Sequence, residues 1–232
     1  MRRDFNGKTV VILGGTGGIG GAIAVAFREC GARVCTHGLK GEYKADIRSS
    51  KGLVALFKKI LAEQTRIDIV VNAVSAPVVI APFERKTWKD FKGHLDVQLK
   101  AAVETATQVI PVMKKQGGGR IVHILTTYVN GIIPTSTADY ITAKYALLGF
   151  TRALAKEVGR YNITVNAVSP SFIPTTFNAH IPEKIQDFII RETPLGRLAT
   201  LNDVVRAVLF LASEDASYIT GEDIQISGGS HR

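Results

Sequence analysis

The 232-residue sequence contains only two cysteines, Cys30 and Cys35, and no repeat or low-complexity segment. Two cysteines exclude a disulfide-rich scaffold. Both stand in or beside apolar segments, so we expect buried free thiols in a reducing compartment. The first apolar run, residues 10–13, is too short for a signal-peptide core, and no stretch has the length of a membrane span. We therefore expect a cytoplasmic protein with no membrane partner.

Negative charge is also scarce: 29 lysines and arginines face 20 aspartates and glutamates, which gives a net charge of +9. A basic surface attracts nucleic acids, anionic membranes or phosphorylated ligands. The basic residues are scattered, in runs no longer than pairs such as Lys58-Lys59, and no nucleic-acid-binding motif is present. The charge therefore favours a solvated surface and a small phosphorylated ligand over specific nucleic-acid binding.

Short apolar runs alternate with longer amphipathic segments along the whole chain. Buried strands are predicted at residues 8–13, 33–36, 45–47, 67–73, 120–125, 164–168 and 223–227, and helices at 19–30, 52–64, 87–115, 139–159 and 202–211. Strands that are apolar on both faces and separated by helices predict an α/β fold with a doubly wound parallel sheet of about seven strands. No linker divides the sequence, so we expect a single domain over residues 1–232.

The connection between the second and third predicted strands, residues 38–44, has only about seven residues. A crossover helix needs a dozen or more residues. We therefore expect the helix after the second strand to be missing or shortened to a turn, which leaves that edge of the sheet thinly covered.

A glycine cluster at residues 14–21 follows the first predicted strand and opens the first predicted helix. Glycines permit unusual backbone angles and let a diphosphate approach the chain closely. The helix N-terminus offers unpaired N–H groups and a partial positive charge to the phosphates. This strand-turn-helix context predicts dinucleotide binding rather than a merely flexible turn.

Tyr140 and Lys144 stand four residues apart in a predicted helix and therefore share one helix face. An unperturbed phenol has a pKa near ~10, and a nearby ammonium lowers that pKa because it stabilises the phenolate. Such a pair makes Tyr140 a usable acid towards a carbonyl and a base towards an alcohol. The alternative interpretation is an aromatic core residue beside a surface lysine.

These motifs, taken in order, resemble those of the short-chain dehydrogenase/reductase family. Gly14-x-x-x-Gly18-x-Gly20 is similar to its nucleotide loop, and Tyr140-x-x-x-Lys144 to its signature. Further matches are Ala45-Asp46-Ile47, Asn166-Ala167-Val168-Ser169-Pro170, Ile219-Thr220-Gly221-Glu222 and Gly228-Gly229. The resemblance implies a Rossmann-like fold, an NAD(P)-dependent oxidoreductase, and a homotetramer or homodimer formed through the long helices at 87–115 and 139–159.

The same resemblance implies where a nicotinamide cofactor is held. Asp46 would contact the adenine, Lys144 the nicotinamide ribose and Thr175 the carboxamide. The full set of implied cofactor residues is Gly14, Thr16, Gly18, Ile19, Gly20, His37, Gly38, Asp46, Ile47, Asn72, Ala73, Tyr140, Lys144, Pro170, Ile173 and Thr175.

The end of the second predicted strand favours NADP over NAD. Members that prefer NAD carry an acidic residue there, whereas the equivalent position in this sequence is Gly38. A carboxylate would repel the 2′-phosphate of NADP, so its absence removes that barrier. Arg33 and Lys40 offer positive charge, but Gly17 stands where many NADP-preferring members carry a basic residue. NAD is kept as the alternative cofactor.

Two members of the family's catalytic set are replaced. Its serine after the fifth strand corresponds to Thr126 by strand register and to Thr127 by the interval to the tyrosine. Its asparagine corresponds to Gln98, whose longer side chain can displace the water relay that recharges the tyrosine. Two further motifs are altered, and they read Asn72-Ala73-Val74-Ser75 and Pro170-Ser171.

The leading hypothesis is reversible hydride transfer between NADP(H) and a small-molecule carbonyl or secondary alcohol, with Tyr140 as general acid/base assisted by Lys144. The alternative, motivated by the altered motifs, is a cofactor-binding protein of low or no activity that acts as a sensor or partner subunit. Residues 176–193 are expected to form a substrate lid that covers a hydrophobic substrate, or else a variable surface insertion. No metal site is predicted.

Overall fold

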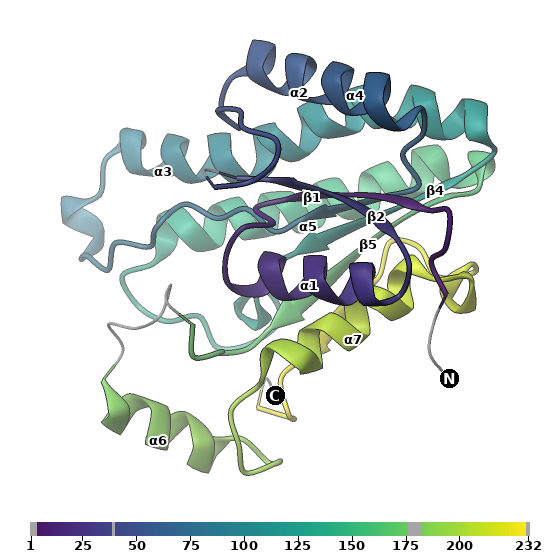
Figure 1. Cartoon of the computed structure of the whole chain (residues 1–232). Coiled ribbons are helices and arrows are strands. Elements are labelled where there is room, and N and C mark those ends of the chain that lie inside the picture. Colours follow the sequence, from purple (N-terminus) through teal and green to yellow (C-terminus); the bar gives the residue numbers. More distant parts are fainter. Residues whose placement is uncertain (1–3, 39, 176–181, 231–232) are drawn as a thin grey trace.

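The computed structural model describes residues 4–38, 40–175 and 182–230. In these residues, six parallel strands form one sheet in the order β2-β1-β3-β4-β5-β6. The strands are β1 (Thr9–Leu13), β2 (Arg33–His37), β3 (Ile69–Asn72), β4 (Gly119–Ile124), β5 (Ile163–Pro170) and β6 (Asp223–Ile226). Helices cover both faces of the sheet, which confirms the predicted single-domain, doubly wound α/β fold (Figure 1).

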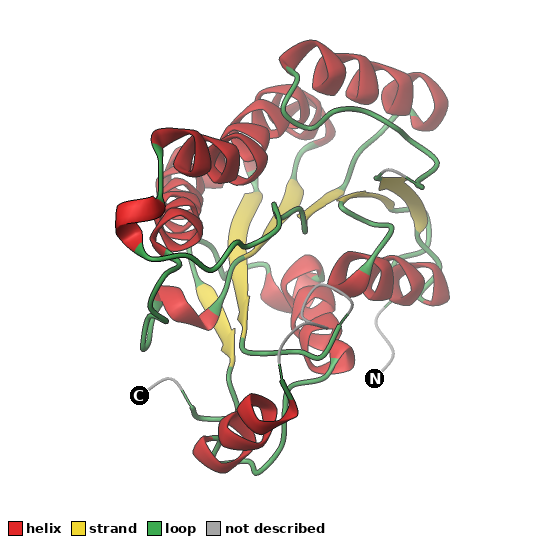
Figure 2. Ribbon diagram, turned by 90° about the vertical axis from the view of Figure 1, so that its left-hand side faces the viewer, coloured by secondary structure: helices red, strands yellow, loops and turns green. Residues whose placement is uncertain are grey.

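The covering helices divide between the two faces of the sheet. One face carries α1 (Gly18–Glu29) and α7 (Leu201–Ala212), and the other carries α2 (Ser50–Gln64), α4 (Ala101–Gln116) and α5 (Ala138–Val158). Figure 2 shows the sheet between these two helical layers. Each face has its own apolar core, which explains why the strands are apolar on both sides.

The helical region predicted at residues 87–115 consists of three consecutive segments. They are α3 (Trp88–Leu95), a π-helical segment (Asp96–Lys100) and α4. The π-helical segment carries Gln98, whose side chain is fully buried. Single π-helical turns inside α-helices are frequent at functional sites. Short 3-10 turns occupy Phe83–Arg85, Thr127–Val129, Gly159–Tyr161 and Glu214–Ala216.

The strand predicted at residues 45–47 is wrong, and the sheet described has six strands rather than about seven. The Ala45 carbonyl lies 3.0 Å from the His37 imidazole, and the Asp46 carbonyl accepts the N–H of Ser49. The backbone therefore turns into α2 rather than extending along the sheet. The missing crossover helix is confirmed, since the described residues between β2 and α2 contain no helix.

One residue, Tyr43, pairs with the edge of the sheet where the predicted strand and the crossover helix are absent. Tyr43 forms one parallel bridge with His37 at the outer edge of β2. Its side chain is only 1% exposed, and its hydroxyl donates to the Glu63 carboxylate of α2 at 2.5 Å. One aromatic ring thus fills the space beneath this edge of the sheet.

A further helix, α6 (Glu183–Glu192), lies in the second part of the expected lid and was not predicted. It stands apart from the sheet and the helices that cover it (Figure 1). Ile185 and Phe188 on α6 are 49% and 55% exposed. Residues 176–181 of the expected lid lie outside the described residues. Among the helices described, none has the length and apolarity to cross a membrane.

Candidate active site

The carboxyl ends of the strands bring the predicted site residues to one edge of the sheet. Gly14 follows β1, His37 ends β2, Asn72 ends β3, Thr126 follows β4 and Pro170 ends β5. The chain runs outward from β1 to β2 and then returns to β3 on the other side of β1. Open α/β sheets bind ligands in the crevice that such a reversal creates.

The glycine loop packs too closely on its neighbours to carry side chains at two positions. Gly14 has a φ of 79°, and a Cβ there would lie 2.8 Å from the Ala73 carbonyl oxygen. A Cβ at Gly20 would lie 2.2 Å from the Gly14 carbonyl oxygen. Residues 16–18 are exposed at the start of α1, which has no side-chain cap. The N-terminus of α1 therefore presents its N–H groups to an anion at this edge.

The end of β2 lies directly beside the glycine loop. The Gly15 N–H donates to the His37 carbonyl at 2.9 Å, and a Cβ at Gly38 would lie 2.3 Å from Thr16 Oγ1. The His37 side chain is 5% exposed, and its Nδ1 has no partner among the described residues. A side chain at position 38 would require the exposed Thr16 side chain to move.

The residues expected around the adenine, Asp46 and Ile47, are more exposed than His37. Asp46 and Ile47 lie in the turn before α2, and the Asp46 carboxylate accepts hydrogen bonds from the Arg48 guanidinium at 3.0 and 3.1 Å. These bonds lower the pKa of the Asp46 carboxyl. Asn72 is 2% exposed, and its Nδ2 lacks a partner in the part of the chain described.

The strand β5, which leads towards the expected lid, is held in place through Asn166. Its side-chain Nδ2 donates to the Ile219 carbonyl at 2.8 Å, and its Oδ1 accepts the Glu222 N–H at 3.0 Å. Both bonds join β5 to the turn before β6. Beyond the end of β5, Ile173 is buried and Thr175 is half-buried beside the undescribed residues.

Tyr140 and Lys144 share one face of α5, as the spacing predicted. Lys144 Nζ lies 5.7 Å from the centre of the Tyr140 ring and donates to the Ile124 carbonyl at 2.8 Å. The Thr126 side chain lies close enough to the Tyr140 phenol to lower its pKa. Thr127 is buried at the start of a 3-10 turn. Of the two threonines, the structure therefore brings Thr126 to the tyrosine.

Burial dominates the ionisation of this pair. It raises the pKa of Tyr140 to about 12 and lowers the pKa of Lys144 to about 7, because both charged forms lose their hydration. The expected lowering of the Tyr140 pKa by Lys144 is therefore wrong for this structure. The Lys144 ammonium donates to the Ile124 carbonyl, and the loss of solvent is the largest influence on the pKa of Tyr140.

Gln98 lies in a buried polar cluster that the sequence pattern did not indicate. Its Nε2 is 3.4 Å from His94 Nδ1, and the His94 ring meets the Tyr140 ring edge-on with centroids 5.7 Å apart. Lys86 Nζ lies 2.8 Å from Asp139 Oδ2, and the same oxygen is 3.7 Å from His94 Nε2. The signals available were the position of Asp139 directly before Tyr140 and the spacing of four between His94 and Gln98.

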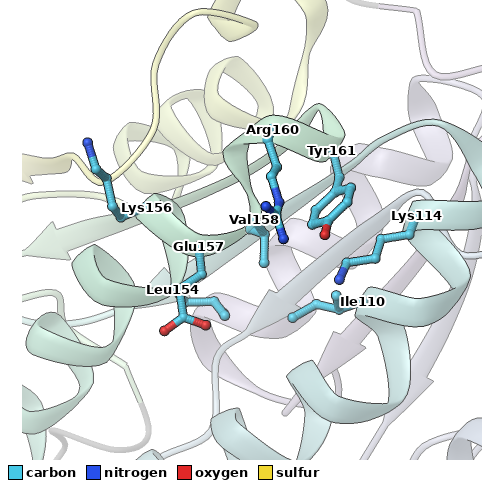
Figure 3. A pocket seen from close by; sticks show the side chains of 8 residues that line it. All are labelled: Ile110, Lys114, Leu154, Lys156, Glu157, Val158, Arg160 and Tyr161. Carbon is cyan, nitrogen blue, oxygen red and sulfur yellow. The ribbon is translucent and has the colours of Figure 1, made fainter.

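A hollow of about 460 Å³ lies elsewhere, between the C-terminal parts of α4 and α5 (Figure 3). Lys114 and Arg160 lie over the Tyr161 ring there, at 3.9 and 4.8 Å from its centroid. Tyr161 lies two residues before β5, so this hollow is at the amino edge of the sheet, opposite Tyr140. It is separate from the candidate active site. No group of three metal-ligating side chains occurs in the part of the chain described.

Comparisons with known proteins extend over nearly the whole chain. The family model described as enoyl-(acyl carrier protein) reductase matches residues 14–231. The 3-oxoacyl-[acyl-carrier-protein] reductase FabG of Rickettsia felis is 35% identical over 240 residues, which cover 97% of this chain and 98% of that protein. The FabG of Aquifex aeolicus is 34% identical over 249 residues and 99% of each chain.

A solved structure shows the same fold. The gluconate 5-dehydrogenase of Burkholderia cenocepacia, in complex with NADP and tartrate, matches with a TM-score of 0.92 at 23% identity. The match covers 99% of this chain and 97% of the other. Sequence motifs, fold and relatives agree: the chain belongs to the short-chain dehydrogenase/reductase family of NAD(P)-dependent oxidoreductases.

Proposed function

We propose that this protein interconverts a carbonyl and a secondary alcohol by hydride transfer with NADP(H). The observation that carries the proposal is the meeting of Thr126, Tyr140 and Lys144 at the carboxyl edge of the sheet. They come from the end of β4 and one face of α5, and the glycine loop lies at the same edge. A hydroxyl donor, a phenol and an ammonium are the groups needed to polarise and protonate a carbonyl oxygen.

The residues at this edge fit a nicotinamide dinucleotide. The loop at Gly14 and Gly20 lets a diphosphate approach the backbone at the N-terminus of α1. His37 Nδ1 and Asn72 Nδ2 are buried polar atoms without partners among the described residues, and a bound ligand would satisfy them. When bound, the cofactor supplies or accepts the hydride.

The glycine at position 38 supports NADP as the preferred cofactor. No carboxylate stands at the end of β2, so the barrier that selects against a 2′-phosphate is absent. Lys40, exposed two residues further on, adds positive charge.

Tyr140 acts as the acid in this proposal. Its raised pKa keeps the phenol protonated at neutral pH, which is the form that donates a proton to the oxygen of a reduced carbonyl. The Thr126 hydroxyl donates a hydrogen bond to the same oxygen. Lys144, when protonated, stabilises the phenolate that remains. In the reverse direction the phenolate takes the proton back.

The named relatives point to 3-oxoacyl thioesters as the substrate class. Such substrates combine a carbonyl with an apolar chain, and apolar side chains are exposed on the loops after β3 and β4 and on α6. They are Val79, Ile80, Phe83, Ile132, Ile133, Ile185 and Phe188. In this proposal α6, in the described part of the expected lid, covers the bound chain.

Tyr140→Phe tests the proposed role of the phenol. We expect turnover of a 3-oxoacyl thioester with NADPH to fall by about a thousandfold, because the acid is lost, while the Kd for NADPH changes little. Tyr145→Phe is the matched control, since Tyr145 lies on the same helix with 43% exposure. Undiminished turnover by Tyr140→Phe would overturn the assignment.

A second candidate function is cofactor binding with little catalysis. It is favoured by the altered motifs, in which Gln98 stands where the family has an asparagine and Thr126 or Thr127 where it has a serine. A screen of carbonyls and alcohols with NADPH and NADH separates the two functions. Tight cofactor binding without turnover would favour the sensor or partner subunit.

The homodimer or homotetramer expected from the resemblance stays a prediction. Leu147 and Leu154, on the helix proposed as an interface, are buried within the chain itself. Val103 on α4 and Tyr145 on α5 are exposed at 37% and 43%. These two side chains, rather than the buried leucines, would lie in such an interface.

A further inference from the structure

A deeply buried ion pair lies beside the proposed acid but has no part in the proposed reaction. Lys86 Nζ and Asp139 Oδ2 are 2.8 Å apart, and the two side chains are 3% and 2% exposed. Asp139 is in the first turn of α5, directly before Tyr140, and Lys86 lies just before α3. Burying two charges is costly unless their geometry is good and further hydrogen bonds complete it.

Further hydrogen bonds show that the Lys86–Asp139 ion pair connects two loops. Lys86 Nζ also donates to the Val79 carbonyl at 2.6 Å. Nearby, the Ala81 N–H donates to the Ser136 carbonyl at 3.3 Å. The loop after β3 is thereby fixed to the segment that leads into α5. A change at Lys86 therefore acts on the helix turn that carries Tyr140.

His94 connects the ion pair to the phenol ring. Its Nε2 lies 3.7 Å from Asp139 Oδ2, and its ring packs edge-on against Tyr140. Asp139 Oδ1 has no partner among the described residues. The negative charge of Asp139 is thus balanced mainly by Lys86, and an imbalance would act on both His94 and Tyr140.

The charged and titratable groups that face this site come from several elements. Lys144 on α5 and Asp90 on α3 act on His94, together with the ion pair itself. Tyr128, in the turn after β4, acts on Tyr140. Because Lys86 and Asp139 cancel, the positive charge near the phenol comes from Lys144 when it is protonated.

We propose that Lys86 and Asp139 are positioning residues for Tyr140, which hold the first turn of α5 against the loop after β3 and keep a second net charge away from the phenol. The inference rests on the proposed function, in which Tyr140 is the acid. An unpaired Asp139 carboxylate would oppose the phenolate and raise the pKa of Tyr140. An unpaired Lys86 ammonium would favour the phenolate and lower that pKa.

A charge cycle of Lys86→Met, Asp139→Asn and the double variant tests the proposal. The raised pKa of Tyr140 puts the wild-type loss of kcat/KM for carbonyl reduction at strongly alkaline pH; Lys86→Met should keep its activity to a higher pH than the wild type, and Asp139→Asn should lose it about one unit earlier. The double variant should return close to the wild-type midpoint. A purely structural role predicts lost activity in all three variants with no opposite shifts, and that result would overturn the proposal.

The NMR titration of His94 measures the same charge balance without turnover. Its signal is identified by its loss in His94→Gln. Lys86→Met should raise the pKa of His94 and Asp139→Asn should lower it further, with the double variant between them. An unmoved His94 would overturn the inference. If His94 moves as expected but the wild type reduces no carbonyl, the charge balance stands and the proposed function fails.

Two controls separate this effect from a general loss of charge or of folding. Lys92→Met removes a lysine from a solvent-exposed pair on α3, where Lys92 is 59% exposed, and should move neither midpoint. Lys86→Arg keeps the charge and should keep the wild-type midpoint. The double variant leaves no buried charge unpaired, so it folds where a single variant fails. A folded double variant with the midpoint still displaced would overturn the proposal.

Discussion

The glycine loop and the surroundings of Tyr140 lie at the same edge of the sheet but are built in opposite ways. The loop depends on the absence of side chains, since a Cβ at Gly14 or Gly20 would lie within 2.8 Å of another atom. The surroundings of Tyr140 depend on side chains brought together from separate elements and buried with their charges. A site formed by the backbone can be recognised in the sequence as glycines at fixed spacing. A site formed by buried charged side chains can be recognised only in the folded structure.

The largest effect should come from removing the buried charge of Lys144. Burial lowers the pKa of Lys144 from 10.5 to about 7, so the unfolded chain binds more protons than the folded chain between those values. The wild-type free energy of unfolding should therefore rise with pH through this window. Lys144→Met should remove the rise and be more stable by about 3 kcal/mol at pH 6, allowing for the lost bond to Ile124.

Denaturant unfolding of both proteins between pH 6 and 10 measures this difference. If the free energies of unfolding of the wild type and Lys144→Met depended equally on pH, the prediction would be wrong. Burial of the Lys144 ammonium would then carry no free-energy cost.

A smaller effect should come from adding one methyl group to the glycine loop. A Cβ at Gly20 would lie 2.2 Å from the Gly14 carbonyl oxygen, so Gly20→Ala must displace the turn. We expect NADPH affinity to fall by about 2 kcal/mol, or about thirtyfold, in a fluorescence titration. At Gly17 nothing lies within 4 Å and φ is −153°, so Gly17→Ala should bind like the wild type. Equal affinities of the two variants would contradict the prediction.

The smallest effect, on kcat, should show which of the two threonines is the hydrogen-bond donor beside Tyr140. Thr126→Val keeps the shape of the side chain but removes its hydroxyl, and should lower kcat by about tenfold through one lost hydrogen bond. Thr126→Ser should stay near the wild type. A larger loss in Thr127→Val than in Thr126→Val would show that the interval to the tyrosine, rather than strand register, identifies the donor.

The parts of the fold with a local cause could be predicted from the sequence. Apolar runs separated by amphipathic segments indicated the six strands of the sheet. The glycine cluster indicated the turn between β1 and α1. The strand at 45–47 was predicted wrongly because its apolar residues suggested a strand, whereas the Asp46 carbonyl accepts the Ser49 N–H and the Ala45 carbonyl lies beside the His37 imidazole. The helix α6 was not predicted either. None of its residues is buried, so it packs little against the core.

The buried cluster beside Tyr140 could not be predicted either. Lys86 and Asp139 are 53 residues apart in the sequence, and each is a common surface residue type. Their meeting depends on how α3 packs against α5, which periodicity does not encode. The roles of Tyr140, Lys144 and Thr126 stay predictions until the variants are measured, although the structure brings the three together.

The bridge at Tyr43 also bears on the solubility of the protein. β2 is an edge strand, and an unpaired strand edge can recruit a strand of another molecule and start aggregation. The Tyr43 N–H donates to the Thr36 carbonyl, and the Gly38 N–H donates to the Tyr43 carbonyl. The exposed Arg33 adds charge at the other end of the strand. The bridge thus occupies the backbone groups at the carboxyl end of β2, so fewer groups of this edge are left to pair with a strand of another molecule.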